Sequence, residues 1–242
     1  MQKLNKNYEI VSQIYSHLMK KIRYDFWAEY LYKLTQEYVS KIANVLELGA
    51  GNCLLAHHFK KYSKKIIATD LSFQMLDFSK DKKLKRVCCN MTSLPFQTSF
   101  DLIYSCFDSI NYLTRKRDIN NLFSNISSLL SDKGIFTFDV SLENNSMVHI
   151  KEAISEGKYK GINYKHFTSF DKKKKIHKNE FEIKLNDKKI YREVHKQKIY
   201  SFIDYFKLIQ KNGLFVVECF NAFTFNDADE NSKRVQFIVK KT

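Results

Sequence analysis

This 242-residue chain contains one proline and six glycines, so few positions are forced to interrupt regular structure. No apolar run approaches the roughly 18 residues that a membrane-spanning helix needs, and the first residues carry no apolar signal core; we therefore expect a cytoplasmic protein without a membrane segment. The five cysteines are an odd number and several lie in apolar runs, which favours buried thiols over a disulfide framework. Because no CxxC or HxxxH spacing occurs, we expect no metal site.

Acidic residues are also scarce, since 26 Asp and Glu stand against 41 Lys and Arg and the formal net charge is +15. Such a charge is found in proteins that bind nucleic acid or membrane surfaces. The lysines are spread along the chain, however, and the only tight run, Lys172 to Lys175, lies beside Asp171 at a predicted hairpin turn. We interpret the charge as solvated surface, so nucleic acid is a less favoured partner than a small molecule.

From residue 43 onward, apolar strand-like runs alternate with helical patterns. The predicted strands are 43–48, 66–69, 86–89, 102–106 and 135–140, and the predicted helices are 52–61, 72–80 and 117–130. Ser72 is the expected N-cap of the second of these helices, and Asp132-Lys133-Gly134 is the expected turn into the last strand. This alternation predicts an open parallel α/β sheet with helices on both faces.

Additional elements are predicted on both sides of the alternating region. Two amphipathic helices are expected at 4–20 and 25–40. Within residues 142–200, the pattern predicts a helix at 146–155. It then predicts an antiparallel meander of three strands at 164–170, 176–185 and 189–200, with a turn at Asn186-Asp187. A helix at 202–211, ended by Asn212-Gly213, precedes strands at 214–220 and 234–240. We expect residues 1–141 and 201–242 to form one domain and residues 142–200 to form an inserted subdomain.

The densest functional signal is the run Val45-Leu46-Glu47-Leu48-Gly49-Ala50-Gly51. Two of the six glycines follow a buried strand here, and a residue without Cβ permits positive φ and close approach of a ligand. Ligands of open α/β sheets bind beyond the carboxyl ends of the strands. The next predicted strand ends at Asp70, where an ionised carboxylate can accept hydrogen bonds from both hydroxyls of a ribose. Together these features predict a nucleoside site.

Signals for phosphate binding are missing from the same loop. The third glycine of a GxGxxG turn is replaced by Leu54, no basic residue lies in the loop, and no GK[ST] occurs in the chain. The remaining features are a glycine turn led by Glu47, a ribose carboxylate and polar residues after the third strand. This combination suits S-adenosylmethionine (SAM), a nucleoside with an amino-acid tail and no phosphate.

The segments LELGAGNC, ATDLSFQML, NMTSLPF, FDLIYSCFDSINYL and SDKGIFTFDV resemble, in order, the motifs of class I SAM-dependent methyltransferases. The resemblance covers roughly residues 40–140. More weakly, IYSHLMKKIRYDFW and EVHKQKIYS resemble a small-molecule-type subgroup with a β insertion. The resemblance implies a Rossmann-like, mostly parallel sheet of seven strands whose last strand is antiparallel. It also implies SAM as the methyl donor and S-adenosylhomocysteine as the product.

By this resemblance, the loop residues Gly49, Ala50 and Gly51 line the methionine moiety. Glu47 supports the loop or reaches the tail amine, and Asp70 holds the ribose. These assignments place the donor across the carboxyl ends of the first two strands.

The resemblance also assigns the adenine side of the site to Leu71 and Met75, with a backbone N–H from Met91. The family usually has Asp after the third strand, and this chain has Asn90, whose side-chain oxygen is expected to accept a hydrogen bond from the adenine amine. Cys106, after the fourth strand, is expected to be a buried thiol against the cofactor.

The scarcity of proline excludes two kinds of nucleic-acid methylation and so narrows the choice of methyl acceptor. Methylation of exocyclic base amines commonly uses [DN]PP[FYW], and C5-cytosine methylation uses a Pro-Cys nucleophile; the only proline is Pro95, so both motifs are absent. We expect methyl transfer to nitrogen or oxygen of a small molecule, by a monomer or homodimer. The alternatives are an RNA or protein methyltransferase and a non-catalytic SAM-binding regulator, and an acceptor-sized cavity at the methyl group argues against the last.

His195 is the predicted base. It shares one face of a predicted strand with Glu193 and Gln197, and an imidazole, whose unperturbed pKa is about 6.5, can take a proton from an amine or a hydroxyl. The alternative is a structural hydrogen bond between subdomains. The residues predicted to contact the acceptor are His195 itself and four aromatic residues, Tyr15, Tyr24, Trp27 and Phe107.

Overall fold

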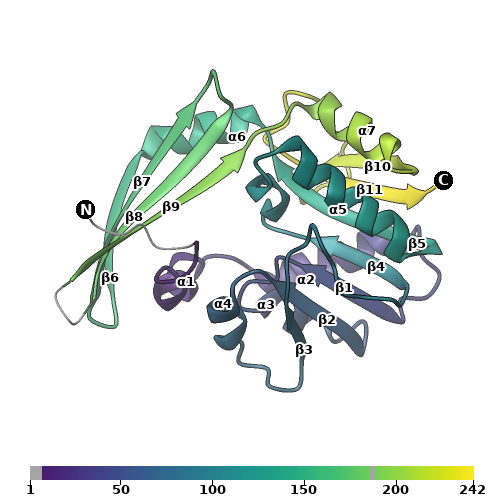
Figure 1. The fold of residues 1–242 in the computed structure, drawn as a ribbon, viewed down its shortest axis with the longest axis horizontal. Coiled ribbons are helices and arrows are strands. Elements are labelled where there is room, and N and C mark those ends of the chain that lie inside the picture. Colours follow the sequence, from purple (N-terminus) through teal and green to yellow (C-terminus); the bar gives the residue numbers. More distant parts are fainter. Residues whose placement is uncertain (1–6, 186–188) are drawn as a thin grey trace.

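The computed structural model describes residues 7–185 and 189–242, which contain two separate β-sheets (Figure 1). The larger sheet has seven strands in the order β10-β11-β5-β4-β1-β2-β3. The strand β11 runs antiparallel to both of its neighbours, β5 and β10, and the other strand pairs of this sheet are parallel, which confirms the predicted Rossmann-like architecture. The strands are β1 (Asn44–Leu48), β2 (Lys65–Asp70), β3 (Lys85–Cys88), β4 (Phe100–Ser105), β5 (Leu130–Ser141), β10 (Leu214–Asn221) and β11 (Arg234–Lys241).

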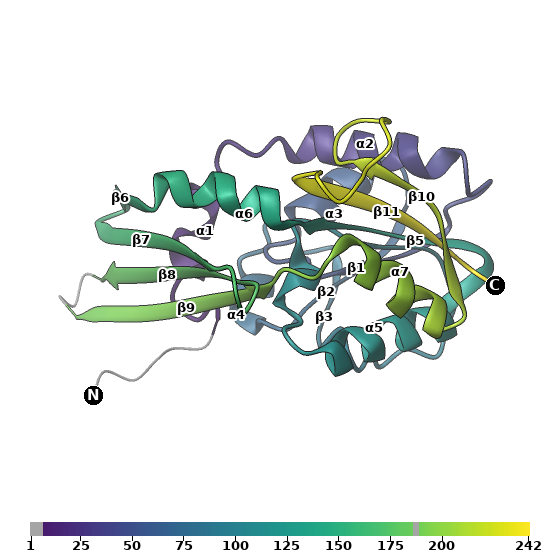
Figure 2. The ribbon, with the colours of Figure 1, turned by 90° about the horizontal axis from the view of Figure 1, so that it is seen from above.

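Helices cover both faces of this sheet (Figure 2). One face carries α2 (Tyr24–Gln36) and α3 (Leu54–Phe59), and the other carries α5 (Lys116–Leu129) and α7 (Phe202–Lys211). The helix α5 forms because its apolar residues recur every three or four positions and are all buried: Ile119, Leu122, Phe123, Ile126 and Leu129. The predicted αL cap of α7 is confirmed by Gly213, at φ +68°.

The start of β5 differs from the prediction. The strand begins at Leu130, directly after α5, and includes the Asp132-Lys133-Gly134 segment that was expected to be a turn. Leu130 pairs with Phe100, and the ladder then shifts register before Leu102 pairs with Ile135. A bulge therefore absorbs the turn-forming residues within the strand.

The second sheet is antiparallel and lies between β5 and α7 in the chain. It follows α6 (Glu143–His149) and the short 3₁₀ helix η2 (Ile150–Glu152), and its strands are β6 (Ile154–Tyr159), β7 (Ile162–Asp171), β8 (Ile176–Lys184) and β9 (Ile190–Lys198). The helix predicted at 146–155 is wrong at its end, because β6 begins at Ile154. This strand escaped prediction because it is an exposed edge strand without apolar alternation.

The first helix is shorter than predicted and packs on the second sheet. The helix α1 (Ser12–Leu18) buries Val11 and Ile14 against a group on that sheet, namely Ile162, Phe181 and Ile183. The next helix, α2, instead packs on the seven-stranded sheet. Residues 4–6 of the predicted helix and the predicted Asn186-Asp187 turn lie outside the described residues. Among the described residues, no helix is long and apolar enough to cross a membrane.

Candidate active site

The site begins at the point where the strand order reverses. The chain passes from β1 to β2 and β3 on one side, and then to β4 and β5 on the other. In this arrangement Leu48 pairs with both Thr69 and Ser105, so the carboxyl ends of β1, β2 and β4 meet at one edge. A crevice at such an edge is the usual ligand position of an open α/β sheet.

The glycine loop after β1 adopts conformations that other residues disfavour. Gly49 and Gly51 have φ of +66° and +56°. A Cβ at Gly49 would lie 2.8 Å from the side chain of Ser109 and 3.5 Å from Met91 Cε, and one at Gly51 would lie 3.1 Å from Met75 Cε. Both glycines therefore permit a close backbone approach, which fits a ligand lying directly on the loop.

We expect Gly49→Ala to lower the free energy of unfolding by about 1–2 kcal/mol or more, because alanine disfavours the left-handed region and its Cβ meets Ser109. SAM affinity should fall at the same time. Gly213→Ala is the matched control, since Gly213 has φ +68° but its Cβ would meet only atoms at 3.6 Å and beyond. Chemical denaturation and calorimetric titration with SAM measure the two effects. Equal SAM binding by both variants would contradict a ligand on the Gly49 loop.

Asp70 closes the loop from the end of β2. Its Oδ2 accepts the Gly51 N–H at 2.8 Å, and its Oδ1 accepts the Ser72 N–H at 2.8 Å. Burial raises the pKa of this carboxyl, and these backbone donors partly offset the shift. Ser72 in turn caps α4 (Phe73–Asp77) by accepting the Met75 N–H, as predicted. Each Asp70 oxygen retains acceptor capacity for a ribose diol.

The predicted adenine contacts lie in different surroundings. Leu71 is 70% exposed and Met75 is buried, so Leu71 offers an open apolar surface to a flat ring. The Asn90 Oδ1, predicted to face the adenine amine, accepts both the backbone N–H and the hydroxyl of Thr92, at 2.9 and 3.0 Å. The Met91 side chain lies beside Gly49.

Three buried polar groups with incomplete hydrogen bonding lie behind the glycine loop. Among the described residues, Glu47 Oε2 and the hydroxyls of Tyr24 and Tyr104 form no hydrogen bond of good geometry, although Tyr104 lies close enough to Glu47, and Tyr15 to Tyr24, to offset part of the rise that burial causes in the pKa of each. Burial raises the pKa of Glu47 well above its ordinary value, and burial with the nearby Glu47 carboxylate raises the pKa of Tyr24 to about 12. Unsatisfied buried groups of this kind are rare and need an explanation. A polar amino-acid tail on the loop fits such a set.

The end of β4 is strained. Phe107 and Asp108 both have left-handed backbones, at φ +61° and +48°. The Phe107 ring packs 4.3 Å from Trp27 and 5.4 Å from Tyr24. The preceding Cys106 is buried, and burial raises the pKa of its thiol well above the ordinary value, so it remains a protonated thiol rather than a nucleophile.

A buried ionic group holds this strained segment to β5 and β11. Arg234 pairs with Asp139, and its second terminal nitrogen lies 3.2 Å from Asp108 Oδ2. The Asp108 N–H donates to Asp139 Oδ2 at 2.9 Å, and Ser141 Oγ donates to Asp108 at 2.5 Å. Burial raises the pKa of Asp139 to about 6 although the guanidinium opposes the shift. No local sequence pattern indicates this group, because its members come from three distant segments.

A cavity of about 660 Å³ opens between the two sheets, beside Phe107. It is bounded by α1, the 3₁₀ helix η1 (Ser109–Tyr112), α6 and the second sheet. Of the predicted acceptor contacts, Tyr15, Trp27, Phe107 and His195 line it, whereas Tyr24 packs behind Phe107. Five of the seven histidines line it: His17, His149, His166, His177 and His195. Hydroxyl and amide side chains share the wall: Ser141, Asn145, Ser146, Ser155, Thr168, Asn179 and Gln197.

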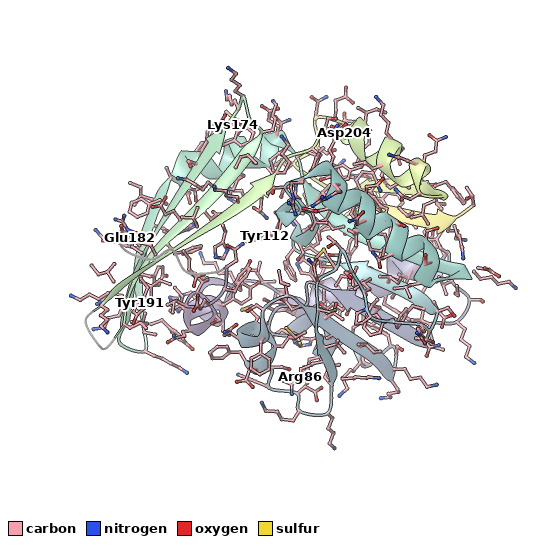
Figure 3. All side chains as sticks on the ribbon, viewed as in Figure 1. Arg86, Tyr112, Lys174, Glu182, Tyr191 and Asp204 are labelled. Carbon is pink, nitrogen blue, oxygen red and sulfur yellow. The ribbon has the colours of Figure 1, made fainter. Side chains whose placement is uncertain are left out.

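His195 is buried, at 2% exposure, on the face that it shares with Glu193 and Gln197. Its Nε2 lies 3.1 Å from Glu193 Oε2 and its Nδ1 lies 3.2 Å from Tyr112 Oη. Tyr112 projects between the two sheets (Figure 3), and its hydroxyl lies 2.7 Å from that of Tyr8. Tyr8 and Tyr112 were not predicted as site residues. Tyr112 belongs to the quoted FDLIYSCFDSINYL segment, but Tyr8 had no distinguishing signal.

Known proteins share this architecture. The family model described as "Methyltransferase domain" matches residues 45–134. A relative from Geobacillus sp. (strain WCH70), named "Putative methyltransferase GWCH70_2453", is 30% identical over 97% of this chain and 99% of its own.

Solved structures extend the similarity to the whole fold. A SAM-dependent methyltransferase from Clostridium acetobutylicum ATCC 824 is 21% identical, with a TM-score of 0.80 over 98% of this chain and 99% of its own. SAM-bound CalS10, an amino pentose methyltransferase from Micromonospora echinaspora, has a TM-score of 0.72 at 11% identity over the full length of both chains. These matches agree with the glycine loop, the strand-end carboxylate and the strand order described above. They show that the chain belongs to the class I SAM-dependent methyltransferases.

Proposed function

We propose that this enzyme methylates a nitrogen or oxygen atom of a small polar acceptor held between its two sheets. The observation that carries the proposal is the cavity of about 660 Å³ beside the end of β4, a volume in the range of small-molecule sites. Its imidazole, hydroxyl and amide groups suit an acceptor with several hydrogen-bonding groups. CalS10, which has the same overall fold, is an amino pentose methyltransferase. An acceptor-sized cavity also argues against a non-catalytic SAM-binding regulator.

We assign the donor site to the loop and strand ends. Gly49, Ala50 and Gly51 would lie along the methionine moiety, Asp70 would bind the ribose, and Leu71 would cover the adenine. When bound there, SAM supplies a methyl group on a positively charged sulfur. The protein has to align the acceptor with that group, and alignment alone can contribute about 7–11 kcal/mol. Residues 142–200, which provide most of the opposite wall, would form the acceptor-binding subdomain.

The proposal is tested by measuring methyl transfer from SAM to a panel of amino sugars, hydroxylated sugars and small amines, with S-adenosylhomocysteine formation as the readout. We expect turnover of at least one panel class. RNA and protein substrates belong in the same panel, and transfer to them alone would contradict a small-molecule acceptor.

His195 is proposed as the base on which removal of the acceptor proton depends. His195→Ala should leave the Kd for SAM within about twofold and lower kcat by about a hundredfold, the lower end of what a general base contributes. His57→Ala is the control, because His57 is exposed on α3, away from the cavity. Full activity of His195→Ala would remove it from the mechanism.

A further inference from the structure

His195 cannot meet the acceptor directly in this structure. The ring is buried and both nitrogens already face a partner, Glu193 Oε2 at 3.1 Å and Tyr112 Oη at 3.2 Å. The Tyr8 ring lies against its face, with centroids 4.5 Å apart. A proton that reaches His195 must therefore arrive through one of its hydrogen-bonded neighbours.

The direction of these hydrogen bonds follows from Glu193. This carboxylate is fully buried and accepts backbone N–H groups of the N-terminal segment, from Tyr8 at 2.8 Å, from Val11 at 2.9 Å and also from Ile10. Three such donors stabilise its negative charge. An ionised carboxylate only accepts, so His195 Nε2 carries the hydrogen and Nδ1 is left as the acceptor for the Tyr112 hydroxyl.

Tyr112 then retains capacity for one further partner. Its oxygen donates to His195 Nδ1 and accepts from the Tyr8 hydroxyl at 2.7 Å, which leaves one lone pair on a residue of the cavity wall. Burial raises the pKa of Tyr112 above its ordinary value, so the phenol is neutral and is not a base by itself. It can accept a proton only while passing its own to His195.

We propose that Tyr112 is the catalytic residue that takes the acceptor proton, and that Glu193 is the positioning residue that holds His195 to receive the proton of Tyr112. This inference rests on the proposed methyl transfer. The acceptor N–H or O–H bond breaks and its electron pair stays on the acceptor atom. The acceptor proton bonds to Tyr112 Oη as the Tyr112 proton bonds to His195 Nδ1. The resulting imidazolium is paired with the Glu193 carboxylate until it releases a proton to solvent.

The proposal also links the N-terminal segment to catalysis. The N–H groups of Tyr8, Ile10 and Val11 reach Glu193 only when this segment is docked on the second sheet. The same docking brings the Tyr8 hydroxyl to Tyr112. The relay is therefore complete only when the N-terminal segment is docked as it is in this structure.

Two readouts test the relay, and the first needs no acceptor. In protein labelled with 15N-histidine and saturated with S-adenosylhomocysteine, NMR should show His195 protonated on Nε2 and unprotonated on Nδ1. Tyr112→Phe should shift the Nδ1 resonance and leave Nε2 bonded to Glu193. Protonation of Nδ1 in the wild-type protein would overturn the relay even if methyl transfer is confirmed.

The second readout is the pH–rate profile with an acceptor that turns over in the panel. Titratable groups facing the His195 ring are Glu193 on β9, Tyr112 on η1, Tyr8 in the N-terminal segment and His166 on β7. Glu193→Gln removes the negative charge that pairs with the imidazolium, so the acid limb of the kcat profile should move to lower pH. A purely structural role for Glu193 would lower kcat without moving that limb.

Tyr112→Phe should lower kcat at least about tenfold while the Kd for SAM stays within twofold. Tyr200→Phe is the matched control, because the Tyr200 hydroxyl bonds the Leu113 carbonyl just after η1, outside the cavity lining, and its kcat should be unchanged. Full kcat in Tyr112→Phe, with an acceptor that the wild-type enzyme methylates, would overturn the relay. Absence of any acceptor would instead count against the proposed function, and the NMR result would still decide the relay.

Discussion

Replacing Asp70 with alanine is expected to weaken SAM binding by about 3–6 kcal/mol, roughly a hundredfold or more in Kd. Each ribose hydroxyl bound to an ionised carboxylate contributes about 1.5–3 kcal/mol, and the substitution removes two such contacts. It also leaves the Gly51 and Ser72 N–H groups without their acceptor. Calorimetric titration should show micromolar SAM or S-adenosylhomocysteine binding by the wild-type protein and none in the same range by the variant.

The control for this experiment is Asp77→Ala, which removes an exposed carboxylate from the neighbouring helix α4 and should leave SAM affinity within about twofold. Asp70→Asn separates the two functions of Asp70. Its amide oxygen can still accept one loop N–H, so the loop should stay folded while one ribose acceptor is lost. Unchanged SAM binding by Asp70→Ala would disprove the ribose assignment.

The part of the site that was predictable from sequence is the part encoded by neighbouring residues. A glycine loop and a strand-end carboxylate are local features, because positive φ demands glycine and parallel strands bring their carboxyl ends together. Gly49, Gly51 and Asp70 could therefore be assigned before the fold was known. The strand alternation sufficed to predict an open α/β sheet, and the family resemblance implied its seven strands.

The remainder depends on tertiary packing. His195 could be singled out by its strand face, but the position of Tyr8 and Tyr112 against it follows from how α1 docks on the second sheet, which no local pattern specifies. The edge strand β6 was missed for a related reason, since its residues are exposed and its pairing with β7 alone makes it a strand. The hydrogen bonds of Thr92 to the Asn90 side-chain oxygen were likewise not predicted.

Replacing Arg234 with methionine is expected to lower the free energy of unfolding by about 3–5 kcal/mol at pH 8, because it leaves the fully buried Asp139 without its counter-charge. Burial alone would lower the pKa of Arg234, but the carboxylates of Asp108 and Asp139 outweigh it and raise that pKa. Arg115→Met is the control. Arg115 pairs with Asp118 in solvent, so its loss should cost about 1 kcal/mol or less.

The pH dependence identifies Asp139 as the source of the loss. Burial already raises the pKa of Asp139 to about 6 from an ordinary value of 3.8, and removing the guanidinium raises it further. A carboxyl with a raised folded-state pKa contributes stability that is fully present below the unfolded-state pKa and is lost as pH rises through the folded-state value. The difference between wild type and Arg234→Met should therefore be largest at pH 8 and smaller at pH 5. Adding Asp139→Asn should abolish this dependence, and a difference that is equal at both pH values would assign the loss to packing instead.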